Sequence, residues 1–185
     1  MPRRKPQKPN YAFIDSQNLN LGIQRMGWKM DWRKFRQWLE KEHNVSHAYM
    51  FIGYMSDNES LYEYMHELGF LVVLKPTINV SIANEDGEKN EDGEEKEKHM
   101  IKGNVDAELV LYAMKELPNY NQAIIVSGDG DFFSLAEYLN NERKLANIMT
   151  PNWQYSTLLK VFEDKIIRLD QKRRQLSYHD HKKKK

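Results

Sequence analysis

The feature that most constrains the fold of this chain is a regular alternation of short apolar runs with amphipathic stretches. Each run is apolar at consecutive positions, which is typical of strands buried on both faces of a sheet. Five runs have this character: YAFID (residues 11–15), HAYMFIGY (47–54), FLVVLK (70–75), QAIIVS (122–127) and KLANIM (144–149). Their alternation with helical stretches predicts right-handed crossovers and a mostly parallel sheet covered by helices. The predicted fold class is therefore α/β.

The stretches between the runs carry the spacing and end signals of helices. The apolar residues of 32–41 lie three or four positions apart with charges between them, which predicts an amphipathic helix that Asp31 caps. A second helix is predicted over residues 58–68, where Gly69 supplies the stop. Further helices are predicted over residues 104–117, 132–140 and 156–162. The apolar segment 166–169 then closes the domain.

Residues 76–102 interrupt this alternation. Pro76 ends the third run, and the pattern through Val80 and Ile82 predicts a β-hairpin. Residues 85–97 at its tip are dense in Glu and Lys and include two Asp-Gly pairs, which favours an acidic, solvated protrusion. A calcium loop is not indicated, because the D-x-D-x-D-G spacing is missing.

The composition predicts one folded domain with basic ends. A hydrophobic fraction of 40% in 185 residues supplies enough apolar side chains for a single core. We expect the domain over residues 11–170, between a basic N-terminal tail (1–10) and a basic C-terminal tail (171–185). The net charge of +1 gives the whole molecule no strong attraction to nucleic acid. The tails are therefore either merely solvated or local contacts for a phosphate backbone.

Several kinds of site and location are excluded. The chain has no cysteine, which excludes a disulfide framework, a thiolate zinc site and a cysteine nucleophile. The apolar run after the basic N-terminus is too short for a signal peptide, and no run approaches the ~20 apolar residues that cross a bilayer. We therefore expect a cytoplasmic protein with no membrane contact.

Carboxylates follow the first and the fourth apolar runs. Asp15 ends the first run, and Asp129 and Asp131 come directly after the fourth. Open parallel sheets bind ligands at the carboxyl ends of their strands, where the strand order reverses. We predict the strand order 3-2-1-4-5, which makes these two strands neighbours. Asp106, in the first turn of the helix predicted from residue 104, either joins this edge or compensates the helix N-terminus.

Four carboxylates at one edge of a sheet indicate a bound cation, because gathering like charges does not stabilise a fold by itself. Oxygen ligands without Cys or well-spaced His favour Mg²⁺ or Mn²⁺ over zinc. Such ions activate water and neutralise phosphate charge, which favours hydrolysis of phosphodiesters. The rival hypothesis is phosphoryl transfer to an aspartate, as in receiver domains, whose acidic pair follows the first strand. The order in this chain is the reverse.

Three polar residues beside these carboxylates are candidates for substrate contacts. Asn18 can orient a water or a phosphate oxygen, and it can equally cap the helix that follows it. Lys102 and Ser127 are weaker candidates for phosphate contacts, since a lysine near the base of a hairpin is commonly solvated.

The segment SGDGDF, residues 127–132, has a backbone suited to a sharp turn. Gly128 and Gly130 carry no side chain, so the turn can present Asp129 and Asp131 without bulky neighbours. Asp131 can also serve as the N-cap of the helix predicted from residue 132.

Three motifs in their order along the chain, FIDSQN, KGNVD and SGDGDF, resemble those of the NYN domain family in its bacterial LabA-like form. This family is a branch of the PIN-like nuclease superfamily, and the resemblance covers residues 11–169. It implies a Rossmann-like three-layer α/β/α sandwich and hydrolysis of RNA by metal-activated water. It also implies a metal site, with Asn18 in support, formed by four carboxylates: Asp15, Asp106, Asp129 and Asp131.

Two hypotheses for function follow. The first is a Mg²⁺- or Mn²⁺-dependent endoribonuclease that cuts single-stranded RNA and leaves 5′-phosphate and 3′-hydroxyl ends. The second is a binding or regulatory module that holds RNA or a protein partner and cuts nothing. Its support is the acidic tip and Tyr112, which stands where many NYN relatives carry another acidic residue. Glu108 is a nearby substitute, but it faces a different side of the helix.

The oligomeric state is open from sequence. A homodimer through aromatic residues of the second run, Tyr49, Phe51 and Tyr54, is one hypothesis. Burial of these residues in the core is the favoured interpretation, because large aromatic side chains contribute most when they are removed from water.

Overall fold

The computed structural model describes residues 8–54, 58–76, 78–81, 99–102 and 105–179. Its centre is a six-stranded sheet in the order β3-β2-β1-β6-β7-β8, and every neighbouring pair is parallel. The strands are β1 (Asn10–Asp15), β2 (Val45–Tyr54), β3 (Leu71–Pro76), β6 (Ala123–Val126), β7 (Leu145–Thr150) and β8 (Ile166–Arg168). The predicted order 3-2-1-4-5 is confirmed for the first five of them. The sixth, β8, is the apolar segment that the sequence showed only as a closing piece.

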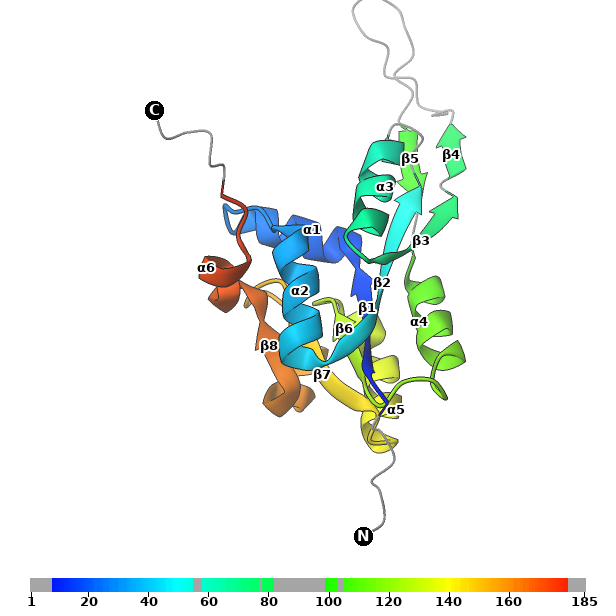
Figure 1. Cartoon of the computed structure of the whole chain (residues 1–185). Helices are drawn as coiled ribbons and strands as arrows, with labels where there is room; N and C mark the ends of the chain where they lie inside the picture. The colour runs from blue at the N-terminus through cyan, green and yellow to red at the C-terminus, as the bar shows by residue number, and fades with distance from the viewer. Residues whose placement is uncertain (1–7, 55–57, 77, 82–98, 103–104, 180–185) are drawn as a thin grey trace, which may run out of the picture.

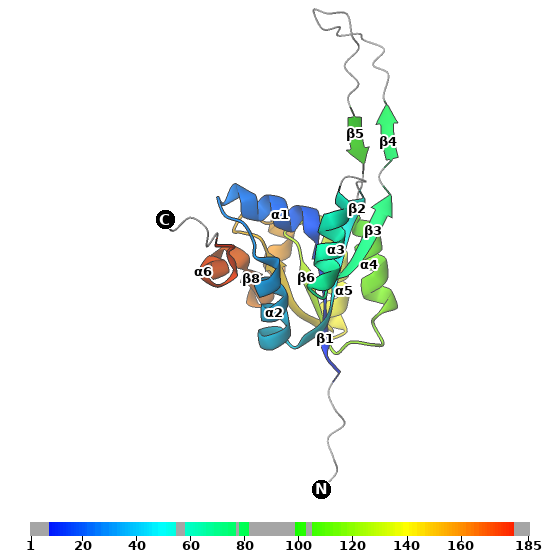
Figure 2. The same ribbon diagram turned by 45° about the horizontal axis from the view of Figure 1, so that its top comes forward.

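Helices cover both faces of the sheet, as Figures 1 and 2 show. They are α1 (Ser16–Arg25), α2 (Trp32–His43), α3 (Glu59–Glu67), α4 (Asp106–Lys115), α5 (Phe133–Asn141) and α6 (Arg173–Leu176). Short 3₁₀ segments accompany them: η2 (Gly130–Phe132), η3 (Thr157–Lys165) and η4 (Leu169–Lys172). In the described part of the chain, no helix has the length and apolar character needed to cross a membrane.

Most predicted helices lie where the sequence placed them. Asp31 caps α2, because its carboxylate accepts the N–H of Lys34 at 3.1 Å. Gly69 follows α3 with a φ of +86°, in the left-handed region that a glycine adopts without strain. The sequence did not predict α1, whose segment is rich in Asn and Gln, and the helix predicted over residues 156–162 is a 3₁₀ segment.

The sheet separates two apolar cores. Residues of β1 alternate between them, with Ala12 and Ile14 on one face and Tyr11 and Phe13 on the other. The first core is completed by α1, α2, α3 and α6, and the second by α4, α5 and η3. This is the predicted three-layer α/β/α sandwich, and it explains why the strands are apolar at consecutive positions.

A separate antiparallel pair, β4 (Ile78–Ser81) and β5 (His99–Lys102), forms the predicted hairpin. Figure 2 shows the two strands projecting away from the sandwich. The predicted acidic tip lies outside the described residues.

The chain beyond residue 170 differs from the predicted basic tail. Residues 171–179 complete η4, form α6 and pack against the loop before α2. Leu176 is fully buried, and the N–H of Asp31 donates to its carbonyl at 2.8 Å. The N–H of Tyr178 donates to the carbonyl of Lys29 at 2.9 Å. The folded part therefore continues at least to His179, because the Leu176 side chain anchors this basic segment to the first core.

Candidate active site

Asp15 is the best-defined residue of the candidate site. It ends β1 and is only 6% exposed, and it serves as the N-cap of α1. One carboxylate oxygen, Oδ1, accepts the backbone N–H of Asn18 at 3.0 Å. The other oxygen, Oδ2, accepts the hydroxyl of Ser127 at 3.1 Å. The carboxylate is thus held in one orientation between β1 and β6, where the strand order reverses.

The turn after β6 is tied to the same point. The N–H of Gly128 donates to Oδ1 of Asn18 at 2.9 Å, and the N–H of Asp129 donates to Oγ of Ser127 at 3.2 Å. Asn18 therefore joins the two strand ends, and it does not cap α1, which is the role of Asp15. The side chains of Asn18 and Ser127 are both engaged inside the protein, so their geometry suits positioning of the site.

The electrostatic environment of Asp15 is unfavourable for its charge. Burial raises the pKa of its carboxyl above the ordinary value, and the hydrogen bonds from Asn18 and Ser127 oppose this effect. The charges of Asp106 and Asp129 raise the pKa of Asp15 further. The structure thus brings three of the four predicted carboxylates within electrostatic reach of one another.

Asp131 lies differently from the other three carboxylates. It is exposed, and its backbone N–H donates to Oδ1 of Asp129 at 3.1 Å. Asp129 is therefore the residue that caps the short helix η2, and the alternative that Asp131 caps the following helix is wrong. Asp131 is also absent from the charges that shift the pKa of Asp15.

The described residues contain no group of three or more Asp, Glu or His side chains arranged to hold a metal ion. The site of four carboxylates remains a prediction. Asp106 is the first residue of α4 and is half-buried. Lys102 ends β5, and its side chain lies outside the part of the structure that is described.

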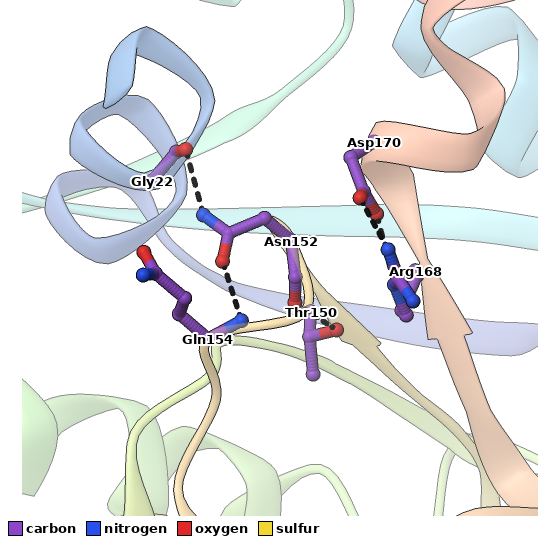
Figure 3. Close-up of polar contacts among 6 residues, drawn as sticks. All are labelled: Gly22, Thr150, Asn152, Gln154, Arg168 and Asp170. Carbon is purple, nitrogen blue, oxygen red and sulfur yellow. Dashed lines mark hydrogen bonds and ion pairs between the residues drawn. The ribbon is translucent and has the colours of Figure 1, made fainter. Parts of the chain in front are cut away.

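A loop that the sequence did not single out forms the other side of this edge. It joins β7, which ends at Thr150, to η3, which begins at Thr157. Figure 3 shows its residues Asn152 and Gln154 beside Thr150. Asn152 is buried, its Nδ2 donates to the carbonyl of Gly22 at 2.8 Å, and its Oδ1 accepts the N–H of Gln154 at 2.7 Å. The hydroxyl of Thr150 donates to the carbonyl of Asn152 at 3.1 Å.

This loop also contacts the turn that carries Asp129. The N–H of Ser156 donates to the carbonyl of Gly128 at 2.9 Å. A Cβ placed on Gly130 would lie 2.4 Å from Oγ of Ser156, so only glycine fits there without a shift. The loop contains no charged residue, so its sequence gives no indication of a functional role. The one indication in the sequence is Gly22, a residue without a side chain inside the helix that packs against this loop.

An ion pair lies at the end of β8, the strand beside β7. Arg168, the last residue of β8, donates to both carboxylate oxygens of Asp170, at 3.1 Å and 2.6 Å (Figure 3). The pair raises the pKa of the Arg168 guanidinium. Asp170 is therefore neutralised locally and adds no free charge to the site.

Comparison with known proteins now identifies the family. The family model for the NYN domain matches residues 11–170. The chain belongs to the NYN family. This family has a PIN-like, nuclease-type fold, in agreement with the parallel sheet and with the position of Asp15 at its switch point.

One curated protein and one solved structure are similar to this chain. This NYN chain is 24% identical over 163 residues to the low amplitude and bright protein LabA of Synechococcus elongatus, a match that covers 85% of this chain and 82% of LabA. A crystal structure of a protein of unknown function from Vibrio parahaemolyticus has the same fold, with a TM-score of 0.68 and 21% identity. That likeness covers 95% of this chain and 99% of the other.

Tyr112 of α4 packs against the sheet in this NYN chain. The ring of Tyr112 packs edge-on against Tyr49 and Phe51 of β2, with a centroid distance of 5.6 Å to each. Phe51 is fully buried in the second core and Tyr49 is partly buried, which confirms the expected core role of these two residues. Tyr54 is the third residue of that set, and its side chain is not described. Glu108 turns toward Lys75 at the end of β3 and forms an ion pair of 3.0 Å.

Proposed function

We propose that this NYN protein is a metal-dependent endoribonuclease that hydrolyses phosphodiester bonds of single-stranded RNA. The observation that carries the proposal is the buried carboxylate of Asp15, oriented by Ser127 and the N–H of Asn18, with Asp106 and Asp129 close enough to raise its pKa. A fold gains nothing from holding three carboxylates near one another unless a cation offsets their repulsion. Membership of a nuclease-type family supports the same interpretation.

The donor set fits Mg²⁺ or Mn²⁺. It consists of carboxylate oxygens alone, and Mg²⁺ keeps several of its waters and binds through one or two protein carboxylates together with substrate phosphates. Such a site does not require three protein ligands in contact with the ion. Asp15 and Asp129 would hold the ion, and Asp106 and the exposed Asp131 would add negative charge near it. The bound ion would lower the pKa of a water and neutralise charge on the scissile phosphate.

The remaining residues act through position. Ser127 and Asn18 fix Asp15 and the turn at Gly128, so that the carboxylates need little reorganisation when substrate binds. Asp129 is held by its own helix-capping bond to Asp131. Attack by water on the phosphate would leave 5′-phosphate and 3′-hydroxyl ends.

The test is incubation of the purified protein with labelled single-stranded RNA in Mg²⁺, in Mn²⁺ and in chelator. We expect cleavage that requires the metal and is lost in Asp129→Asn, which keeps the size and the capping oxygen of the side chain. Asp164→Asn, an exposed position on η3, is the matched control and should cleave like the parent protein. Turnover by Asp129→Asn equal to that of the parent would overturn the assignment of the site.

A second function has an observation of its own in its favour. Tyr112 is packed into an aromatic cluster where many relatives have an acidic residue, and Glu108 is engaged with Lys75. These features favour a module that binds RNA without cutting it. The same experiment separates the two functions, because this module would shift the mobility of the RNA in every buffer while leaving its length unchanged.

A further inference from the structure

Trp153 is an unusual residue for its place in the fold. It is 56% exposed, while Trp28 and Trp38 are buried and Trp32 is partly buried. It lies in the middle of the loop between β7 and η3, at the carboxyl edge of the sheet, between the polar residues Asn152 and Gln154. An indole ring exposed to this degree gives up most of the free energy that its burial would supply.

The backbone on both sides of Trp153 is fixed. Before it, Asn152 is tied to Gly22 of α1 and to the N–H of Gln154, and Thr150 binds the Asn152 carbonyl (Figure 3). After it, Ser156 is bound to Gly128. The ring is therefore carried on a loop whose conformation is already determined, so that a ligand would not need to order this backbone.

The loop also reaches the candidate active site. Around Gly128, the nearest side-chain atoms to a Cβ placed there would be those of Tyr155 at 3.2 Å, Pro151 at 3.5 Å and Asn18 at 3.6 Å. Trp153 thus stands between two residues that flank the turn of Asp129. An RNA strand with a phosphate at Asp15 and Asp129 would therefore have this loop beside it.

We propose that Trp153 stacks against an unpaired base of single-stranded RNA bound at this edge. The inference rests on the proposed function for the identity of the ligand, and it adds the residue that selects single strands. Every base has a π-face that an indole can cover, whereas paired bases are already stacked and unavailable. The uncharged loop beside an acidic centre suits a base on one side and a metal-bound phosphate on the other. One ring between polar neighbours is suited to one base, since a protein interface needs a much larger area.

The test is equilibrium binding of a fluorescein-labelled oligouridine, measured by fluorescence anisotropy in Mg²⁺ and in chelator, with the length of the oligomer checked on a gel. We expect Trp153→Ala to weaken binding about tenfold or more, the usual effect of losing one base-aromatic contact. Trp153→Phe should retain most of the affinity. For an abasic oligomer of the same length, the parent protein and Trp153→Ala should bind equally.

The control is Tyr138→Ala, which removes another exposed aromatic ring, from the second half of α5. It should bind the oligouridine like the parent protein. Binding is read without reference to cleavage, so a protein that binds RNA through Trp153 but never cuts it supports this inference and contradicts the nuclease. If the protein cleaves RNA, and the parent and Trp153→Ala bind the oligouridine with equal affinity, the nuclease is supported and this inference is overturned. Failure of the parent protein to bind the oligomer overturns the inference. The inference is also overturned if the parent protein and Tyr138→Ala form a concentration-dependent dimer and Trp153→Ala is a monomer.

Discussion

The two halves of the sheet's carboxyl edge are built on different principles. The acidic half, around β1, β6 and α4, holds Asp15, Asp106 and Asp129 near one another. Burial raises the pKa of Asp15, and the charges of Asp106 and Asp129 raise it further. The loop half, residues 150–156 after β7, carries no charge and is held by neutral hydrogen bonds and close steric contact. The loop half therefore contributes stability, while the acidic half reduces stability and contains the carboxylates of the proposed site.

This difference gives opposite expectations for substitutions a few residues apart. Changes in the loop half should lower the free energy of unfolding, because they leave buried polar groups unpaired or force rigid atoms apart. Removal of a charge from the acidic half should raise the free energy of unfolding and should abolish the proposed cleavage of RNA. Active sites commonly show this opposition between stability and activity.

The largest loss is expected for Gly22→Val. A Cβ on residue 22 would lie 2.4 Å from Cβ of Pro151, and a proline ring cannot rotate away. Overpacking of this kind costs about 1–3 kcal/mol, and we expect the upper end of that range. Chemical denaturation followed by circular dichroism measures the change. Gln17→Val, an exposed position on the same helix, is the control, and equal stabilities of the two variants would show that the contact with the loop does not matter.

Asn152→Ala should cost somewhat less, about 2 kcal/mol, because it leaves the carbonyl of Gly22 and the N–H of Gln154 without their partners. The midpoint of thermal unfolding should fall accordingly. Gln154→Ala removes a neighbouring exposed side chain and keeps the backbone N–H that Asn152 binds, so it should unfold like the parent. A loss in Gln154→Ala as large as that in Asn152→Ala would contradict the role of the buried amide.

Asp15→Asn should raise the free energy of unfolding at neutral pH, by less than the two loop variants lower it. The pKa of Asp15 is raised in the folded protein, so the folded state binds the proton more tightly than the unfolded state. The stability of the parent protein should therefore fall as pH rises from about 3.9 through the raised folded pKa, and stay low above it. Asn carries no charge to desolvate and still offers an oxygen to the N–H of Asn18.

The measurement is the unfolding midpoint of the two proteins in chelator across that pH range. We expect Asp15→Asn to be the more stable protein at neutral pH, with the gain disappearing toward acid pH. Asp164→Asn, on the surface of η3, provides the reference for loss of one exposed charge. A variant less stable than the parent at neutral pH would mean that the hydrogen bonds to the carboxylate outweigh its burial.

Sequence reasoning predicted the acidic half far better than the loop half. Asp15 and Asp129 follow apolar runs, and the order of the runs placed them side by side, because local hydrophobic pattern and topology rules determine this much. Asn152 and Trp153 have no such local signal. Asn152 depends on its contact with Gly22, 130 residues away in the chain. The loop that carries Trp153 depends on the bond from Ser156 to Gly128, 28 residues away. The hydrogen bond that makes Asp129 the cap of η2 likewise depends on the detailed backbone of the turn.

The smallest effect is expected for Glu108→Gln, which tests whether the acidic half extends onto α4 as far as Glu108. Its ion pair with Lys75 joins side chains that are about one third exposed, and such pairs contribute about 0.2–1 kcal/mol. We expect a loss of stability within that range, matched by Lys75→Met, and metal-dependent cleavage at the rate of the parent protein. A lower rate in Glu108→Gln that is absent from Lys75→Met would show that Glu108 acts at the metal in place of the acidic residue that Tyr112 replaces. The boundary of the acidic half would then lie two residues farther along α4, at Glu108.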